Sequence, residues 1–324
     1  MRSVPFVTVD VFTTSRFAGN PLAVIPDARD LDSAQMQSIA TEFGYSESTF
    51  VLPPSSPDNT ARVRIFTPTA EIPFAGHPNV GTAYVLGRQD EIFGKKAKEL
   101  GGIIRFEENA GLVEVVLADS ERSEVTGARI RAPAPLSVRH DVVPVDLVAR
   151  CVSIDPAQVK TSPYGPVIAS VGLDFAFAEL VSLEALGACR PDVSVFREAA
   201  STYGAAASGF PLLAQWHSVA RARARSKSKS GFFEFIRYIR ARMFAPLDDV
   251  MEDPATGSAS GALAAFLVSQ VPEADVEVEL TVEQGVEMGR RSIIELKVVK
   301  EGGQVTEVYI TGQCVMVMQG TVTV

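Results

Sequence analysis

Hydrophobic and polar residues alternate along much of the chain, and such alternation is typical of strands with one buried face. The first example is VPFVTVDVF at residues 4–12, which is rich in valine and phenylalanine. We expect further strands where similar short runs are bounded by turn-forming residues. They cover residues 20–27, 48–54, 61–68, 166–172, 174–181, 231–246, 276–285, 292–299 and 307–324, with a hairpin over 102–119 that turns at Asn-Ala-Gly.

Helical spacing of apolar residues interrupts the strands at a few places. In residues 30–44 the apolar positions fall near a helical period, Asp32 or Ser33 can cap the start, and Gly44 can end the helix. Further helices are expected over 77–89, 146–153 and 191–203, and in the apolar run that follows Gly257. Strands therefore outnumber helices, and the pattern predicts an α+β protein.

An internal repeat is the strongest sign of how the chain is organised. RVRIFTP at 62–68 matches RARMFAP at 240–246, and each is followed by a short linker and a segment of small residues. These segments, FAGHPNVGTA at 74–83 and DPATGSASGA at 253–262, each lead into an apolar helical pattern. The repeat predicts two related halves, and the space between two halves is a common place for a ligand.

Two other stretches differ from the strand and helix patterns. APAPLSVRHDVVPVD at 132–146 contains three prolines, which suits a linker or an edge strand. RARARSKSKSG at 221–231 is strongly basic. It fits either a phosphate- or partner-binding arm or a solvated loop, and the absence of interleaved aromatic residues favours the loop.

Composition narrows the class of protein. The chain has 324 residues and a formal net charge of −9, whereas nucleic-acid-binding proteins usually carry clustered positive charge. Only three cysteines and three histidines occur, far apart and without a CxxC motif, so we expect neither a disulfide framework nor a structural zinc site. No signal peptide or 18-residue apolar run is found, so we expect no membrane span and a reducing, cytoplasmic location.

The two small-residue segments have the composition of anion-binding helix starts. Small residues let a ligand approach the backbone, and the first turn of a helix offers unpaired N–H groups and a partial positive charge. Such a start suits a carboxylate or phosphate. The alternative is a tightly packed helix start without a ligand, but the duplication together with His77 and Asp253 favours a function. No P-loop or GxGxxG motif is found, so nothing supports nicotinamide or flavin binding.

Glu47 is a candidate acid or base. It lies between two serines, after an expected helix and before an expected strand. It is either an ordinary exposed acid or a carboxyl in a dry cleft, where desolvation would raise its pKa and allow proton transfer at neutral pH. Its position alone does not decide between these two interpretations.

Four composite motifs resemble the phenazine-biosynthesis isomerase-like (PhzF-like) family. They are FAGNPLAVIPDA, MQSIATEFGYSESTFV, RIFTPTAEIPFAGHPNVGTAYVL and MFAPLDDVMEDPATGSASGALAAFL, and they occur in the family's order. The resemblance implies a diaminopimelate epimerase-like fold, with two pseudo-symmetric halves that each curl a mostly antiparallel sheet around a central helix. The expected halves are 1–128, completed by the last strand at about 312–324, and 129–311.

The resemblance also implies a site and a chemistry. Epimerases of this fold use one cysteine from each half, but neither small-residue segment contains a cysteine, so the resemblance is to the branch with a glutamate as proton shuttle. The implied catalytic residues are Glu47, His77, Asp253 and Ser258. The implied substrate-binding residues are Asn20, Ser46, Gly76, Gly257 and Ser258. No metal or organic cofactor is expected, and the expected partners are a small carboxylate-bearing substrate and a second copy of the chain in a homodimer.

Three functions are weighed on this basis. The first is a cofactor-independent isomerase that moves a carbon-bound proton, with Glu47 as acid and base. The second is a non-catalytic binding or interaction protein on the same fold, since fold does not dictate function. The third is a racemase or epimerase that exchanges a proton at one stereocentre.

Overall fold

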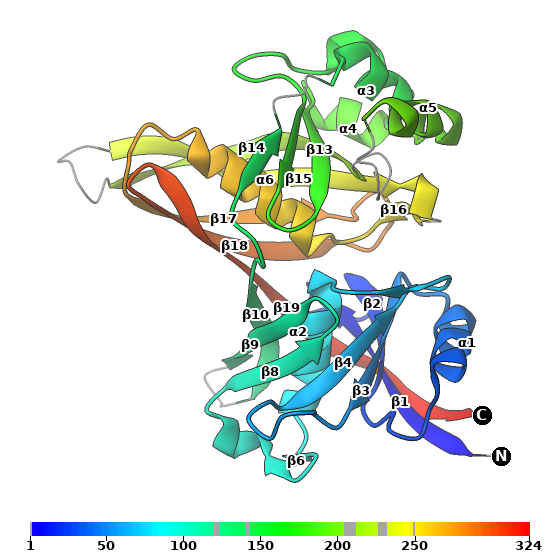
Figure 1. Cartoon of the computed structure of the whole chain (residues 1–324). Coiled ribbons are helices and arrows are strands. Elements are labelled where there is room, and N and C mark those ends of the chain that lie inside the picture. The colour runs from blue at the N-terminus through cyan, green and yellow to red at the C-terminus, as the bar shows by residue number, and fades with distance from the viewer. Residues whose placement is uncertain (1, 120–123, 140–142, 204–211, 226–231, 249) are drawn as a thin grey trace. The chain divides into compact units, whose positions relative to one another are not determined.

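The computed structural model describes residues 2–119, 124–139, 143–203, 212–225, 232–248 and 250–324. These residues form two compact units. Unit 1 comprises residues 1–131 and 311–324, and unit 2 comprises residues 132–310. The chain therefore leaves unit 1 once, builds unit 2, and returns to unit 1 with its last residues. The elements of each unit are labelled in Figure 1.

Unit 1 consists of strands with two α-helices. Its elements are β1 (Ser3–Val11), β2 (Asn20–Ile25), α1 (Ser33–Phe43), β3 (Glu47–Leu52), β4 (Ala61–Phe66), β5 (Glu71–Ile72), α2 (Gly76–Gly87), β6 (Glu91–Ile92), β7 (Lys95–Lys96), a 3₁₀ turn (Ala97–Leu100), β8 (Ile103–Glu108), β9 (Gly111–Asp119) and β10 (Val125–Arg131). The end of β19 (Gln304–Thr323) belongs to the same unit.

The strands of unit 1 close into a ring. Pairing runs β1–β2–β3–β4–β8–β9–β10–β19 and returns to β1. The pairs β2–β3 and β4–β8 are parallel, because helices α1 and α2 make the crossovers between them. Helix α2 contacts β1, β2, β3, β9 and β10, and all its residues from Gly76 to Leu86 are buried. A helix that is apolar on every side must be enclosed, and the ring encloses it.

Helix α1 forms as the sequence pattern predicts. Asp32 is the N-cap, and its carboxylate accepts a hydrogen bond from the Gln35 N–H while the Gln35 side chain bonds the Asp32 N–H. Gly44 ends the helix in the left-handed region, at φ 62°. The buried residues Met36, Ile39 and Ala40 join a core cluster with apolar residues of β1, β2, β3 and β4.

Unit 2 repeats the unit 1 arrangement with longer strands. Its elements are β11 (Ser137–Arg139), α3 (Val145–Cys151), a 3₁₀ turn (Pro156–Gln158), β12 (Val167–Ser170), β13 (Asp174–Glu179), α4 (Leu183–Ala188), α5 (Val193–Tyr203), β14 (Leu212–Arg225), β15 (Phe232–Ala245), a 3₁₀ turn (Pro246–Asp248), β16 (Val250–Asp253), α6 (Gly257–Ser269), β17 (Val276–Gln284), β18 (Ser292–Glu301) and the first part of β19.

The topology of unit 2 follows that of unit 1 step by step. The hairpin β12–β13 leads through α4 and α5 to the parallel strand β14, as β1–β2 leads through α1 to β3. Strand β14 pairs with β15, and β15 then reaches the parallel strand β17 through β16 and α6. Helix α6 contacts β12, β13, β15, β17 and β18 and is buried almost throughout, so it is the central helix of its unit.

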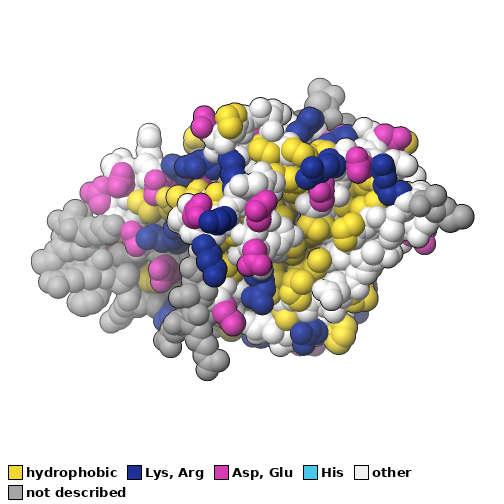
Figure 2. Space-filling view, turned by 90° about the horizontal axis from the view of Figure 1, so that it is seen from below, with side chains coloured by type: hydrophobic (Ala, Val, Ile, Leu, Met, Phe, Trp, Pro, Cys, Tyr) yellow, Lys and Arg dark blue, Asp and Glu magenta, His cyan; other side chains and the backbone are white. Residues whose placement is uncertain are grey.

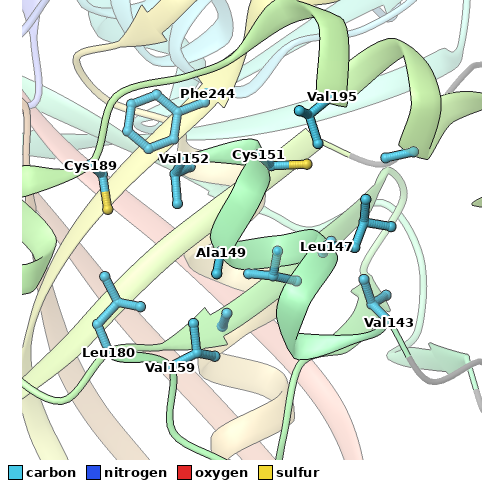
Figure 3. Packing of buried hydrophobic residues seen from close by; sticks show 14 of the residues in the cluster. Val143, Leu147, Ala149, Cys151, Val152, Val159, Leu180, Cys189, Val195 and Phe244 are labelled. Atoms are coloured by element: carbon cyan, nitrogen blue, oxygen red, sulfur yellow. The ribbon is translucent and has the colours of Figure 1, made fainter. Parts of the chain in front are cut away.

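A second apolar core lies under the small helices of unit 2, as Figure 3 shows. Alternate residues of β13, Ala176 and Ala178, belong to it, together with apolar residues of α3, α4 and α5. The thiols of Cys151 and Cys189 are part of this packing. Burial raises the pKa of Cys151 to about 12 and that of Cys189 to about 11, so both remain protonated near neutral pH.

The repeated RxRxFxP motif forms the same clamp in both units. In unit 1 the Arg64 guanidinium donates two hydrogen bonds to Glu71, of 2.8 and 2.6 Å, and lies 5.0 Å from the centre of the Phe66 ring. In unit 2 Arg242 binds Glu252 at 2.8 and 2.7 Å and lies 4.9 Å from the Phe244 ring. Each clamp holds the short strand that precedes a central helix.

The structure corrects one interpretation of the basic segment. Residues 221–225 form the end of β14 and pair with β15 from Ile236 back to Phe232, so they are strand rather than loop. The absence of interleaved aromatic residues favoured a loop, but the alternation of Arg and Ala fits a strand. Residues 226–231 lie outside the described part of the chain.

The surface mixes charges of both signs. On the face in Figure 2, Lys and Arg side chains are interspersed with Asp and Glu, around a band of hydrophobic side chains. Among the helices that the structure describes, none has the length and apolar character needed to cross a bilayer.

Candidate active site

The predicted site residues are divided between the two units. Asn20, Ser46, Glu47, Gly76 and His77 belong to unit 1, and Asp253, Gly257 and Ser258 belong to unit 2. Within unit 1 the first group comes together through the ring, because the starts of β2 and β3 are in register and both strands contact α2.

Glu47 is the first residue of β3 and pairs with Leu22 of β2. Its side chain is 18% exposed, so it is neither an ordinary surface acid nor a sealed one. One carboxylate oxygen, Oε2, lies 3.4 Å from Nε2 of His77. The nearby hydroxyl pair of Thr49 and Thr82, 2.8 Å apart, joins β3 to α2 and fixes the register between them.

His77 is the second residue of α2 and is 5% exposed. Burial lowers the pKa of His77 from its ordinary value of 6.5 to about 3, because the charged imidazolium is costly away from water. The imidazole is therefore neutral at pH 7, with one ring nitrogen protonated and the other able to accept.

Asn20 and Ser46 complete the group on the other side of His77. The Asn20 amide nitrogen lies 3.4 Å from Nδ1 of His77, and the Ser46 hydroxyl donates to the Asn20 amide oxygen at 3.0 Å. Asn20 is fully buried. Their predicted role in substrate binding stays a prediction, and the contacts described here are with protein groups.

The start of α2 has no side-chain cap. Ala75 occupies the N-cap position and gives no side-chain hydrogen bond, so no side chain caps the first N–H groups. The Asn79 amide instead donates to the Ala75 carbonyl at 3.0 Å. The tip of the β8–β9 hairpin supports the same segment, since the Ala110 N–H donates to the Pro73 carbonyl at 3.1 Å.

In unit 2 Asp253 ends β16 and is 7% exposed. Asp253 is not the N-cap residue of α6. Thr256 occupies that position without capping the helix, and its hydroxyl donates to the Asp253 carboxylate at 2.5 Å. Pro254 separates the two, and the residue before a proline is biased toward an extended backbone.

Gln284, at the end of β17, latches this segment in place. Its amide nitrogen donates to the Asp253 carbonyl at 2.7 Å, and its amide oxygen accepts from the Thr256 N–H at 3.2 Å. The next residue, Gly285, has φ +73°, and a Cβ there would lie 2.6 Å from the Pro254 carbonyl oxygen. Only glycine therefore lets β17 pass so close to the approach to α6.

Helix α6 begins with the predicted residues Gly257 and Ser258. Gly257 is buried, whereas Ser258 is partly exposed, unlike the other residues of the helix up to Val268. Like α2, α6 has no side-chain cap. Each unit thus contains one uncapped central helix that is preceded by a clamped strand.

Sequence reasoning missed the latch and both clamps as parts of the site. Gln284 follows the alternating pattern of β17, which predicts a strand but not an inward-facing amide. The arginines were visible as a repeat, but their partners Glu71 and Glu252 lie seven and ten residues further on, at unequal spacing. Among the described residues, no three His, Cys, Asp or Glu side chains gather as a metal site would require.

Comparison with known proteins identifies the family. The model of the phenazine biosynthesis-like protein family matches residues 9–320. An uncharacterized isomerase of Mesorhizobium japonicum is 34% identical over 324 residues, covering 99% of both chains. The trans-2,3-dihydro-3-hydroxyanthranilate isomerase of Pseudomonas fluorescens is 34% identical over 319 residues, covering 98% of both chains.

Solved structures agree with the fold. The crystal structure of a phenazine biosynthesis protein of the PhzF family from Bacillus anthracis superposes with a TM-score of 0.80, at 23% identity and with full coverage of both chains. The predicted diaminopimelate epimerase-like fold is thereby confirmed, with a curled sheet and a central helix in each unit. By sequence and by fold, the chain belongs to the phenazine biosynthesis-like protein family and is an isomerase.

Proposed function

We propose that the chain is a cofactor-independent isomerase of a small cyclic carboxylic acid, and that Glu47 moves the proton. The observation that carries this proposal is the pairing of Glu47 with a neutral, buried His77 at the uncapped start of α2. The substrate named for the Pseudomonas fluorescens relative, trans-2,3-dihydro-3-hydroxyanthranilate, has the carboxylate and ring double bonds that such a reaction needs.

The proposed reaction breaks one C–H bond and forms another. A Glu47 oxygen accepts the carbon-bound hydrogen as a proton, and the electron pair stays on the substrate and shifts the double bond. The proton then returns from Glu47 to a different carbon, so no electrons are gained or lost. One carboxyl group can perform both transfers, which is why the chemistry requires no redox cofactor.

The surroundings of Glu47 support this role. Its partial burial keeps the carboxylate accessible to a substrate while limiting the water that would compete for the proton. The N–H groups at the start of α2, at Gly76 and His77, are suited to a substrate carboxylate or to the charge that develops after proton removal. The catalytic roles of Asp253 and Ser258 and the carboxylate-binding role of Gly257 stay predictions.

The substitution Glu47→Gln tests the proposal. We expect it to lower turnover of trans-2,3-dihydro-3-hydroxyanthranilate by about 10²- to 10⁴-fold while leaving the unfolding midpoint nearly unchanged. Glu42→Gln, on the exposed side of α1, is the matched control and should keep full turnover. An unchanged rate in Glu47→Gln would refute the role of Glu47.

Reaction in D₂O separates the alternatives. The proposed isomerase moves the double bond, and deuterium appears at the carbon that gains hydrogen to the extent that the protonated Glu47 exchanges with solvent before it returns the proton. A racemase would exchange one stereocentre without bond migration, and a non-catalytic binding protein would bind the compound without any exchange. Assembly as a homodimer and a cytoplasmic location stay predictions.

A further inference from the structure

Four side chains of unit 1 form a continuous polar chain that ends at Glu47. Ser46 contacts Asn20 at 3.0 Å, Asn20 contacts His77 at 3.4 Å, and His77 contacts Glu47 at 3.4 Å. Asn20 is 0% exposed and His77 5%, so the middle of the chain is closed to water. Hydrogen bonds within such a chain constrain one another, because each group can donate or accept only in certain ways.

The direction of the Asn20 amide determines which nitrogen of His77 carries the proton. The Asn20 nitrogen faces Nδ1 and is only a donor, so Nδ1 must accept. In this direction of the amide, the Ser46 hydroxyl donates to the Asn20 oxygen at 3.0 Å. A neutral imidazole carries a single proton, which then lies on Nε2, the nitrogen that faces Glu47.

The two tautomers of His77 have opposite effects on Glu47. With the proton on Nε2, the ring presents an N–H to the Glu47 carboxylate and stabilises its ionised form. With the proton on Nδ1, the ring would present a lone pair to Oε2, and only a protonated Glu47 could form a hydrogen bond there. The two atoms lie 3.4 Å apart and do not form a hydrogen bond with each other in this geometry, and catalytic contacts of this kind often tighten only when a substrate binds.

We propose that Asn20 is a positioning residue that fixes His77 as the Nε2–H tautomer, so that the resting enzyme holds Glu47 ionised and ready to accept a proton. The expected effect on turnover rests on the proposed function of Glu47. The assignment of the His77 tautomer does not depend on that function. Asn20 acts through His77 and need not touch the substrate. Ser46 supports it with a hydrogen bond to the amide oxygen.

Nitrogen NMR of the full chain with ¹⁵N-labelled histidine measures the tautomer directly. The chain has three histidines, and a His77→Gln variant identifies the His77 signals by their loss. At pH 7 we expect a protonated Nε2 and an unprotonated Nδ1 in the wild-type protein. A protonated Nδ1, or a cationic ring, at His77 of the wild-type protein would overturn the proposal.

The substitution Asn20→Asp reverses the donor. A carboxylate at that position can only accept, so we expect the His77 proton to move to Nδ1, or a second proton to bind there. With turnover as a second readout, kcat should fall at least about tenfold with KM nearly unchanged, since a positioning defect acts on the chemical step. Gln319→Glu, an exposed change of the same kind on β19, is the control and should alter neither quantity.

Ser46→Ala gives an intermediate case. Loss of the hydroxyl removes one hydrogen bond that restrains the Asn20 amide. The NMR spectrum should therefore show a partial shift toward a mixture of tautomers, and kcat should fall less than in Asn20→Asp. An unchanged tautomer in Asn20→Asp would overturn the role of Asn20. Normal turnover in Glu47→Gln would instead overturn the proposed function and leave the tautomer result standing.

Discussion

Two neighbouring acids on β8 show how strongly the pKa of a carboxyl group depends on its immediate surroundings. Glu107 is the acceptor for the Ser55 and Ser56 N–H groups and for the Asn59 amide, each at 2.8 Å. Burial acts to raise the pKa of Glu107, but these hydrogen bonds outweigh it and lower the pKa to about 2. On the next residue, burial raises the pKa of Glu108 to about 8, opposed only in part by the Asn79 amide.

These environments predict opposite pH dependences of stability. The folded pKa of Glu107 lies below its unfolded value of about 4.3, so Glu107 stabilises the fold above that pH and the contribution is lost as the pH falls toward 2. The folded pKa of Glu108 lies above the unfolded value, so its favourable contribution is complete below about pH 4 and is lost as the pH rises through 8.

The pair Glu107→Gln and Glu108→Gln tests this prediction in urea unfolding at pH 3, 5 and 8. Glu107→Gln should destabilise the protein at pH 8, and the difference from wild type should shrink at pH 3. Glu108→Gln should stabilise it on the order of 2 to 5 kcal/mol at pH 8 and hardly at all at pH 3. Glu99→Gln, whose side chain is 69% exposed, is the control, and parallel responses of the two test variants would contradict the prediction.

At the scale of elements, the two arginine clamps explain why the RxRxFxP motif recurs. Each arginine lies on a long strand, β4 or β15, and its guanidinium stacks on the phenylalanine two residues further on. It also binds a glutamate in the short strand that follows, β5 or β16. Arg242 also donates to the carbonyls of Leu186 and Cys189, both at 3.0 Å, and so holds the end of α4. A lysine cannot reproduce such a planar, multiple interaction.

We expect Arg242→Lys to destabilise the protein far more than Arg64→Lys. The Arg242 side chain is 4% exposed and that of Arg64 is 16%, and breaking a buried, hydrogen-bonded pair costs roughly 3 to 5 kcal/mol. For Arg64→Lys the expected loss is about 1 to 2 kcal/mol. Chemical unfolding measures both, with the exposed Arg150→Lys as the control that should leave the free energy of unfolding nearly unchanged. Equal losses in the two clamps would contradict the prediction.

The elements also show where sequence reasoning succeeds and where it stops. Strong periodicity and caps predicted α1 with its Asp32 and Gly44 ends, and the repeat indicated the two central helices. Strand β10 was missed because it contains Gly127, which weakens a strand pattern. That glycine is required by packing, since a Cβ there would lie 2.0 Å from the Gly312 carbonyl oxygen.

Only part of the candidate site could be predicted from local sequence patterns. Motifs bring Glu47, His77 and Asp253 to attention, because their residue types carry chemistry. The contacts of Asn20 with His77 and of Gln284 with Asp253 join elements that are distant in sequence, β2 with α2 and β17 with β16. No local pattern encodes such contacts, and they became visible only with the fold.

At the scale of the whole molecule, β19 is a single strand that contributes residues to both units. Its first part belongs to unit 2, and its last part pairs with β1 from Ser3 opposite Thr323 to Val11 opposite Cys314. In the ring of unit 1 it lies between β1 and β10. Unit 1 is therefore discontinuous in sequence, while unit 2 is one continuous segment.

A chain that ends at Ile310 should lose unit 1 and keep unit 2. The only tryptophan, Trp216, lies in unit 2 and is 1% exposed, so its fluorescence reports on that unit alone. We expect its emission maximum to stay as in the full chain, while circular dichroism shows lost structure and proteolysis removes residues of unit 1. A chain that ends at Gln319, which retains the pairing from Val7 onward, is the control. A red-shifted Trp216 emission would contradict the independence of unit 2.

The return of β19 to unit 1 also reverses the usual order of events during synthesis. Domains generally fold in the order in which the ribosome produces them. Here the N-terminal half must wait, with β1 and β10 lacking their shared neighbour, until residues 311–324 have emerged. The unit that is translated second is thus the first that can be completed, and a nascent chain stalled before residue 311 would expose the apolar surface of α2 to chaperones.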